Sequence, residues 1–259
     1  MSRIEGRFER LRAANEKALI VFFTAGDPDL GSTEEFVLAA ERAGADIVEL
    51  GIPFSDPVAE GEVIQRANAR ALASGTKIEG IFELVVRLRT KTEIPLVFLT
   101  YANPVENYGR ERFFARCNAA GVDGVIIPDV PFEEKSDFEL PARQNCVDLI
   151  TLIAPTSLDR ISMIAASATG FVYCVSSLGV TGVRANIETK LEPIIAAIRG
   201  ATKTPVAIGF GISTPEQAAS FAGLADGVIV GSALVKLVEA EGAKAGPAIE
   251  AFVRVLKSF

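Results

Sequence analysis

The sequence predicts an α/β fold, a single (β/α)8 TIM barrel over residues 1–259 with an extra helix before the first strand. Short apolar runs alternate with longer amphipathic stretches along the chain, and about eight such runs can be counted. No Pro/Ser-rich linker or low-complexity tract divides them. A chain of 259 residues that is 49% hydrophobic is long enough to bury one large barrel core.

The expected strands are short, rich in β-branched residues and apolar on both faces, as in a buried parallel sheet. Eight of them are the number that a closed barrel needs. In chain order they are Ala18–Thr24, Asp46–Leu50, Leu96–Tyr101, Gly124–Ile127, Leu149–Ile153, Phe171–Val175, Val206–Gly209 and Gly227–Val230.

The stretches between the strands repeat apolar residues at the three- and four-residue spacings of helices that cover a sheet. This pattern predicts helices over Ser32–Ala43, Val63–Leu72, Ile78–Arg89, Leu191–Ile198 and Ala248–Leu256. Residues 2–14 predict a charged helix ahead of the first strand. We expect this helix to plug the N-terminal mouth of the barrel.

A weak internal repeat supports these boundaries. Residues 43–48, 120–125 and 223–228 each run from the end of a helix through a glycine and an aspartate into a strand. We interpret the glycine as a left-handed residue that ends the helix.

Composition excludes several classes of protein. The net charge is −7 with no cluster of Lys and Arg, so a nucleic-acid surface is not expected. The N-terminus lacks an apolar signal core, and no uncharged stretch is long enough for a transmembrane helix. The three cysteines are widely spaced without a CxxC pair, which is typical of reduced thiols in a cytoplasmic protein.

The complete absence of histidine restricts the chemistry further. It removes Ser-His-Asp and Cys-His catalysis and most zinc sites. No lysine stands at an expected strand exit, which argues against a Schiff-base aldolase. Acid–base work is left to carboxylates, Lys, Tyr or Cys, and we expect no metal.

The second strand carries the first candidate catalytic residue. Because side chains alternate in facing along a strand, Ile47 and Glu49 point into the barrel if Val48 and Leu50 point at the helices. Burial raises the pKa of a carboxyl group, which suits a general acid or base. Glu60 lies in the following loop, and the two carboxylates predict an acid–base pair. A structural Glu49 and a solvated Glu60 are the alternatives.

Glycine-rich loops follow the seventh and eighth strands. They contain Gly211 after one strand, and Gly231 and Ser232 after the other. Paired loops in these places form the usual phosphate site of such barrels. Thr181 and Gly182 follow the sixth strand in a loop whose composition is that of a mobile lid or of an ordinary surface loop.

Apolar side chains at other strand exits predict a pocket for a flat ring, although each taken alone is more often core. The candidates are Phe22, Leu99, Tyr101 and Ile127, with Ile153 near them in the pattern. A ring pocket, a phosphate site and two carboxylates together suggest a substrate with a ring at one end and a phosphate at the other.

Several motifs in this order resemble the α subunit of tryptophan synthase over nearly the whole chain. The most specific is Glu-Leu-Gly-Ile-Pro-Phe-Ser-Asp-Pro at 49–57. The others are Thr-Ala-Gly-Asp-Pro at 24–28, Tyr-Ala-Asn-Pro at 101–104, Pro-Asp-Val-Pro at 128–131, Gly-Val-Thr-Gly at 179–182, Gly-Phe-Gly-Ile-Ser at 209–213 and Gly-Ser at 231–232.

The resemblance implies cleavage of indole-3-glycerol phosphate to indole and glyceraldehyde 3-phosphate, without a cofactor in this chain. It implies a β subunit that carries pyridoxal phosphate, in an α2β2 complex. It also implies roles for individual residues: Glu49 as acid–base on indole C3 and the glycerol hydroxyl, Glu60 at the indole N–H, and Tyr173 beside the glycerol and Glu49. By the same resemblance Gly182, Gly211, Gly231 and Ser232 bind phosphate, Thr181 closes the lid, and Phe22, Leu99, Tyr101 and Ile127 flank indole.

The chain departs from the family pattern after Ser-Asp-Pro. Glu60 replaces the commonest Asp, and Glu62 replaces Pro. One extra methylene can displace a carboxylate by about 1 Å. The departure motivates an alternative, a weakly active subunit that mainly activates its β partner. A phosphosugar isomerase is a more distant alternative, because the first strand ends in Phe22-Phe23-Thr24 rather than in an acid or Cys.

Overall fold

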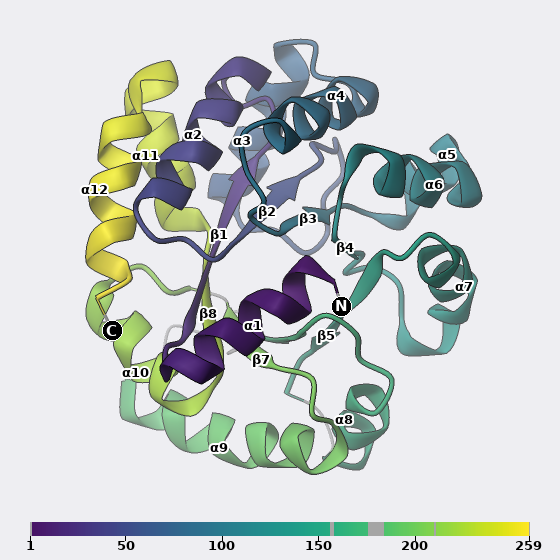
Figure 1. Cartoon of the computed structure of the whole chain (residues 1–259), viewed down its shortest axis with the longest axis vertical. Coiled ribbons are helices and arrows are strands. Elements are labelled where there is room, and N and C mark those ends of the chain that lie inside the picture. Colours follow the sequence, from purple (N-terminus) through teal and green to yellow (C-terminus); the bar gives the residue numbers. More distant parts are fainter. Residues whose placement is uncertain (1, 156–157, 176–183, 210, 259) are drawn as a thin grey trace.

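The strands form a closed parallel barrel in a computed structural model that describes residues 2–155, 158–175, 184–209 and 211–258. Neighbouring strands pair in chain order, and β8 returns to β1. The predicted barrel is confirmed (Figure 1). The strands are β1 (Ala18–Thr24), β2 (Ile47–Gly51), β3 (Leu96–Leu99), β4 (Gly124–Ile126), β5 (Asp148–Ile153), β6 (Val172–Val175), β7 (Val206–Gly209) and β8 (Gly227–Val230).

Helices surround the barrel. Those that the sequence predicted lie within about two residues of the predicted segments, except for α9, which is longer than its predicted core, while α5 to α8, α10 and α11 were not predicted individually. They are α1 (Arg3–Ala14), α2 (Leu30–Arg42), α3 (Glu62–Ala73), α4 (Ile78–Arg89), α5 (Ala102–Tyr108), α6 (Arg110–Ala120), α7 (Ser136–Gln144), α8 (Leu158–Ala165), α9 (Arg184–Ala201), α10 (Pro215–Leu224), α11 (Ser232–Glu241) and α12 (Gly246–Leu256). Short 3₁₀ turns lie at Phe132–Glu134 and Gly242–Lys244. Within the described ranges, none of these helices has the length and apolarity that crossing a bilayer requires.

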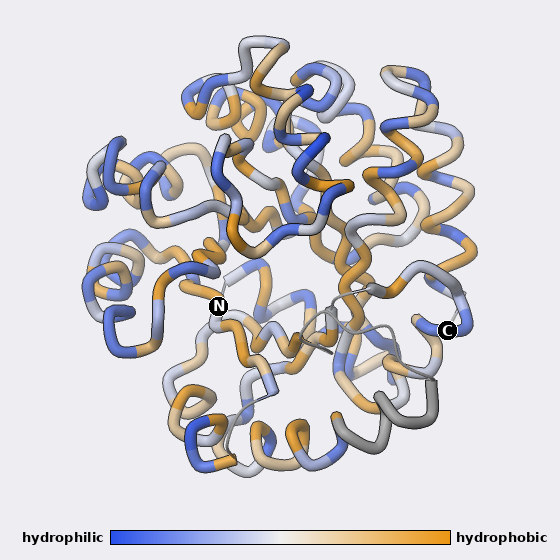
Figure 2. The backbone as a smooth tube through the Cα atoms, turned by 180° about the vertical axis from the view of Figure 1, so that it is seen from behind, coloured by the Kyte–Doolittle hydropathy of each residue, from blue (hydrophilic) through white to orange (hydrophobic). Residues whose placement is uncertain are grey.

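The side chains of the strands divide the core into two layers. Val48 and Leu50 pack outward into the layer under the helices, whereas Ile47 packs inward with Ile20 and Val97. The helices alternate between hydrophilic and hydrophobic segments, while the central strands are mostly hydrophobic (Figure 2). The predicted facing of the second strand is therefore confirmed.

Helix α1 closes the N-terminal mouth of the barrel, as predicted. It crosses that end of the strands (Figure 1), and Ile4, Phe8 and Leu11 join the inner layer of the core. The ring of Phe8 lies 6.1 Å from that of Phe171, next to the first residue of β6. Ser2 caps the helix by accepting a hydrogen bond from the N–H of Glu5.

The aspartates of the internal repeat share one role at this mouth. Asp46 precedes β2, donates its N–H to the carbonyl of Leu19 on β1, and accepts the N–H of Leu19 on its carboxylate. Asp123 does the same with Leu96 on β3, and Asp226 does so with Val206 on β7. Each aspartate therefore extends the ladder to a neighbouring strand by two hydrogen bonds.

The glycines of the repeat are not equivalent. Gly44 and Gly121 have positive φ values of 105° and 92°, as expected for left-handed residues. The prediction was wrong for Gly223, which lies inside the last turn of α10. The chain leaves that helix at Ala225 in an extended conformation, so no left-handed residue is needed there.

Candidate active site

Glu49 lies near the C-terminal end of β2 and faces the inside of the barrel. It is paired in register with Phe22 on β1 and with Val97 on β3. The residue is only 1% exposed. Among the described residues, no atom forms a hydrogen bond with its Oε1. A carboxyl group in such a place is stable in the neutral form, because ionisation would leave a buried charge without a partner.

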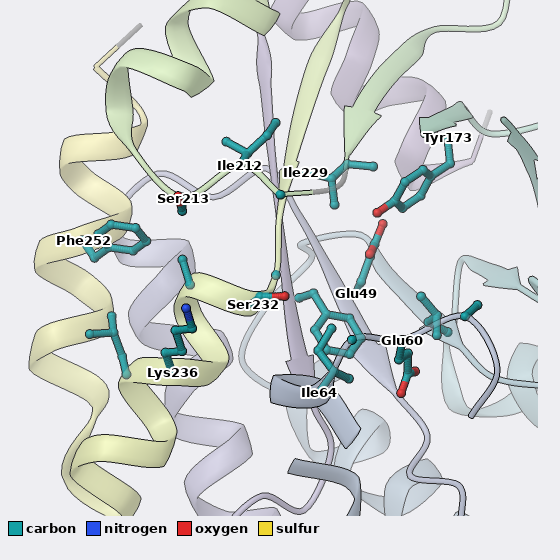
Figure 3. A pocket seen from close by; sticks show the side chains of 18 residues that line it. Glu49, Glu60, Ile64, Tyr173, Ile212, Ser213, Ile229, Ser232, Lys236 and Phe252 are labelled. Carbon is teal, nitrogen blue, oxygen red and sulfur yellow. The ribbon is translucent and has the colours of Figure 1, made fainter. Parts of the chain in front are cut away.

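The electrostatics of Glu49 follow from this burial. Loss of solvent raises its pKa to about 8, so the group holds a proton at neutral pH. Tyr173 on β6 points toward it across the cavity (Figure 3). Burial, and then the negative charge of Glu49, raise the pKa of the Tyr173 hydroxyl well above its ordinary range. Both groups are therefore proton donors at neutral pH.

Glycines on neighbouring strands give these aromatic rings their space. A Cβ on Gly209 would lie 2.5 Å from the hydroxyl of Tyr173, and one on Gly51 would lie 2.6 Å from the ring of Phe22. Both contacts are closer than side chains tolerate. Only glycine at these two positions leaves the space that the Tyr173 and Phe22 rings occupy.

Glu60 reaches the cavity from the loop between β2 and α3. Asn68 on α3 donates its side-chain N–H to Glu60 Oε2 at 2.6 Å, and the Tyr101 hydroxyl also bonds to this carboxylate. Burial raises the pKa of Glu60, and these two hydrogen bonds oppose the rise. Because the NH2 group of the Asn68 amide faces Glu60 and donates to it, this contact favours the ionised carboxylate. Glu60 thus differs from Glu49 in having donors.

A cavity of about 590 Å³ joins the two glutamates to the loops after β7 and β8. Glu49 and Tyr173 lie toward one end, and Ser213, Lys236 and Phe252 toward the other (Figure 3). The cavity brings together eight of the residues that the sequence singled out. They are Phe22, Glu49, Glu60, Leu99, Tyr173, Gly211, Gly231 and Ser232.

The N-terminus of α11 opens into this cavity. Gly231 precedes the helix, and no side chain among the described residues caps it. Helix α10 differs, because Thr214 and Gln217 form a capping box at its start. The N–H groups in the first turn of α11 are therefore open to an anion. Helix α3, whose Gly61 also lines the cavity, likewise lacks a side-chain cap among the described residues, but Glu62 places a negative charge in its first turn. Gly211, with a φ of 77°, lines the cavity from the loop after β7.

Sequence reasoning missed several lining residues, and Lys236 is the most important of them. It lies one turn beyond Ser232 on α11 and lines the same cavity. Residues four apart lie on one face of a helix, so the position of Ser232 could have indicated it. Ile64, Ile212 and Phe252 also line the cavity. They belong to helices and loops whose packing no strand pattern predicts.

The structure does not place Tyr101 and Ile127 in the wall of this cavity. Tyr101 lies beyond the end of β3, accepts the N–H of Ala59 at 3.3 Å, and stacks at 5.4 Å from Phe54. It therefore holds the loop that carries Glu60. Ile127 packs toward the helices and lines a separate, smaller cavity. Thr181 and Gly182 lie outside the described residues.

No group of three or more Cys, Asp and Glu side chains suited to a metal ion occurs in the described part of the chain. Cys117 and Cys174 are free and buried, and burial raises the pKa of each thiol to values at which it is neutral. Neither lines the cavity. The titratable groups near its inner end are therefore Glu49, Glu60 and Tyr173.

Comparison with known proteins agrees with this geometry. A family profile described as tryptophan synthase alpha chain matches residues 8–257. The chain is 52% identical over 240 residues to the tryptophan synthase alpha chain of Alkaliphilus metalliredigens. The aligned region covers 93% of this chain and 90% of that relative.

Solved structures are similar as well. The tryptophan synthase subunit alpha of Legionella pneumophila superposes with a TM-score of 0.90 at 38% identity, covering 99% of this chain and 97% of that one. A chain from the tryptophan synthase a2b2 complex of Pyrococcus furiosus superposes with a TM-score of 0.83 at 36% identity, covering 93% and 98%.

Proposed function

The chain belongs to the tryptophan synthase alpha chain family, and from this premise we propose which of its residues cleave indole-3-glycerol phosphate. The reaction is a retro-aldol lyase step of tryptophan biosynthesis that yields indole and glyceraldehyde 3-phosphate. The bond between indole C3 and the glycerol carbon breaks, and its electrons return to the ring. The hydroxyl on that glycerol carbon loses one proton and indole C3 gains one. The protons therefore balance, and no other reactant is consumed.

Glu49 carries the proton in both directions. Its neutral form donates to indole C3, and the resulting carboxylate accepts the proton of the glycerol hydroxyl as the C–C bond breaks. The observation that carries this proposal is that Glu49 lines the cavity fully buried, faces Tyr173, and has no partner for its Oε1 among the described residues, a setting that raises its pKa. Tyr173 orients Glu49 and the glycerol chain from the opposite wall.

Glu60 stabilises the ring nitrogen while the indole is protonated at C3. A carboxylate beside an N–H that gains positive charge lowers the energy of that state. The hydrogen bonds that Glu60 accepts from Asn68 and Tyr101 support the ionised form that this role requires. The ring would lie between Phe22 and Leu99, which line the cavity near both glutamates.

The phosphate binds at the start of α11. The first-turn N–H groups after Gly231 and Ser232 point at it, and Gly211 lets the opposite loop approach closely. Lys236 supplies a positive charge at the same end of the cavity. By family resemblance, Gly182 completes this site and Thr181 closes over it.

The partner is a tryptophan synthase β subunit in an α2β2 complex, and pyridoxal phosphate belongs to that subunit. Residues 54–58 of the loop that carries Glu60 form the surface toward it, and Val58 there is 78% exposed. We also propose that the chain is one domain that works in the cytoplasm, without nucleic acid or membrane.

The test is indole release by the isolated chain and by its complex with the β subunit. We expect Glu49→Gln to lower turnover at least about 10³-fold in both states while glycerol phosphate still binds, because only the proton carrier is lost. Near-native turnover of Glu49→Gln would contradict the mechanism. If the unmodified chain releases no indole in either state but still activates the β subunit, the chain is an activator rather than a lyase.

A further inference from the structure

A second, smaller cavity lies outside the barrel wall. Its volume is about 200 Å³, and it is bounded by β5, helices α7 and α8, and the loop at 128–132. It shares no lining residue with the large cavity that holds Glu49. Ile127, which the sequence had suggested for the indole pocket, lines this cavity instead. Nothing in the proposed lyase reaction uses it.

The walls of this second cavity are mostly apolar. The side chains of Phe132, Phe138, Leu149 and Ile164 contribute to them. Apolar cavities of roughly 150 Å³ in proteins can bind a molecule the size of benzene. A volume of about 200 Å³ therefore suffices for one small ring or branched chain with a polar group attached.

Lys135 places a cation in this apolar setting. It lines the cavity and is only 8% exposed. Its Nζ donates to Thr151 Oγ1 at 3.0 Å, and to the carbonyl and Oγ of Ser167, each at 3.3 Å. All three acceptors are neutral. Burial lowers the pKa of the ammonium group, as expected for a cation taken out of water.

The anions near Lys135 do not neutralise it well. Among the described residues, its ion-pair partner is Glu139, whose Oε1 is 4.0 Å away on a side chain that is 41% exposed. The other cation of the lining, Arg160, is held at the surface by Glu133 through contacts of 2.7 and 3.1 Å. Lys135 is thus the cation of the lining without a close anionic partner, and a ligand carboxylate would bond to its Nζ in place of one of the neutral Ser167 acceptors.

We propose that this cavity binds a small monocarboxylate with an aromatic or branched apolar body. The carboxylate bonds to Lys135 Nζ and the Thr151 hydroxyl, and the apolar body lies between Phe132 and Phe138. The carboxylate of such a ligand supplies the negative charge that Lys135 lacks at close range. Its apolar body fills the space between the apolar side chains of the cavity.

The experiment uses the full chain with saturating sn-glycerol 3-phosphate in the large cavity. Calorimetry measures binding of phenylacetate and of its neutral isostere phenylacetamide. We expect phenylacetate to bind and phenylacetamide to bind about 30-fold more weakly. Lys135→Met should weaken the binding of phenylacetate by a similar factor. Lys244→Met, at an exposed lysine far from the cavity lining, is the matched control and should bind as the unmodified chain does.

Methyl NMR locates the ligand without any substitution. Phenylacetate should shift the methyl resonances of Ile127, Leu149 and Ile164, and leave those of Ile64 and Ile212 in the large cavity unchanged. The proposal is overturned if phenylacetate does not bind at millimolar concentration, if it shifts only Ile64 and Ile212, or if Lys135→Met binds it equally well. None of these outcomes bears on the lyase reaction, which is measured by indole release.

Discussion

Each mouth of the barrel buries carboxylates beside the ends of the strands. At the N-terminal mouth, Asp46 lies 2.7 Å from Lys257, and Asp123 lies 2.7 Å from Arg89 and 3.1 Å from Arg3. At the C-terminal mouth, Glu49 has no ion pair among the described residues, and its Oε1 has no hydrogen-bond partner there. Asp46 and Asp123 are thus charge-paired, whereas Glu49 is isolated.

This difference separates carboxylates that stabilise the fold from a carboxyl group that can transfer a proton. At the N-terminal mouth, Asp46 and Asp123 each accept a backbone N–H from a neighbouring strand, and lysine or arginine offsets the charge of each. Isolation of Glu49 instead brings its pKa close to the working pH, where transfer in both directions is feasible. Barrels of this type commonly place catalysis at the C-terminal face and stabilising contacts at the other.

The sharpest test of this comparison is the stability of Glu49→Gln as a function of pH. Folded Glu49 keeps its proton up to about pH 8, whereas the unfolded group loses it near 4.5. The stability of the unmodified chain therefore falls as pH rises between these values, and glutamine lacks this loss. Urea unfolding should show Glu49→Gln more stable by on the order of 3 kcal/mol at pH 7, with a smaller gain at pH 5.

The control for this experiment is Glu241→Gln, because Glu241 is exposed at the end of α11. It should not change the pH dependence of unfolding. A stability gain in Glu49→Gln that is equal at pH 5 and pH 8 would mean that Glu49 ionises in the folded chain as an exposed glutamate does.

At the opposite mouth, Asp123→Asn should lower the free energy of unfolding, whereas Glu49→Gln should raise it. Asp123→Asn removes the charge that faces Arg3 and Arg89 and leaves the largely buried Arg89 guanidinium without its carboxylate. We expect the free energy of unfolding to fall by about 3 kcal/mol, at the lower end for buried pairs. The lower end applies because burial still raises the pKa of Asp123, so desolvation offsets part of the attraction.

Asp137→Asn is the matched control for Asp123→Asn, since Asp137 pairs with Arg110 at 3.3 Å on the exposed surface. It should change stability by well under about 1 kcal/mol. Indole release by Asp123→Asn should remain near native below its unfolding transition. A large fall in turnover there would show that the two mouths are not independent.

Asn68→Ala should weaken catalysis at the C-terminal mouth less than loss of Glu49. The amide holds the Glu60 carboxylate and opposes the effect of burial on its pKa. Without it the pKa of Glu60 rises, so the acidic limb of the profile of kcat/KM against pH moves to higher pH. We expect kcat/KM to fall about tenfold near that limb.

Gln65→Ala provides the comparison for Asn68→Ala on the same helix. Gln65 bonds to the backbone carbonyl of Glu60 and not to its carboxylate. It should leave the acidic limb in place. If both variants shift the profile equally, the effect of Asn68 comes from the loop and not from the carboxylate.

The smallest expected effect concerns Lys236→Gln at the phosphate end. Loss of one partly solvated cation should raise KM about fivefold with little change in kcat, and should weaken the dependence of KM on salt. Lys244→Gln, at an exposed lysine that does not line the large cavity, should leave both constants unchanged. An unchanged KM in Lys236→Gln would assign phosphate binding to the backbone N–H groups alone.

Much of the fold and part of the site follow from the sequence. The alternation of strands and helices, the plug formed by α1 and the inward facing of Glu49 depend on local periodicity, which the chain itself contains. Gly211, Gly231 and Ser232 meet because the exits of parallel strands share one end of a barrel. These relations do not depend on details of packing.

Residues that do not sit on a strand needed the tertiary structure. Tyr101 supports the loop of Glu60, Ile127 faces the helices, and Lys236 enters the cavity from the second turn of α11. Their positions depend on where β3 and β4 stop and on how the helices pack against the barrel. The isolation of Glu49 is of the same kind, because it depends on which neighbouring strands bring a cation near and which do not. Sequence periodicity specifies the direction of a side chain, but only the packed fold specifies its neighbours and hence its charge.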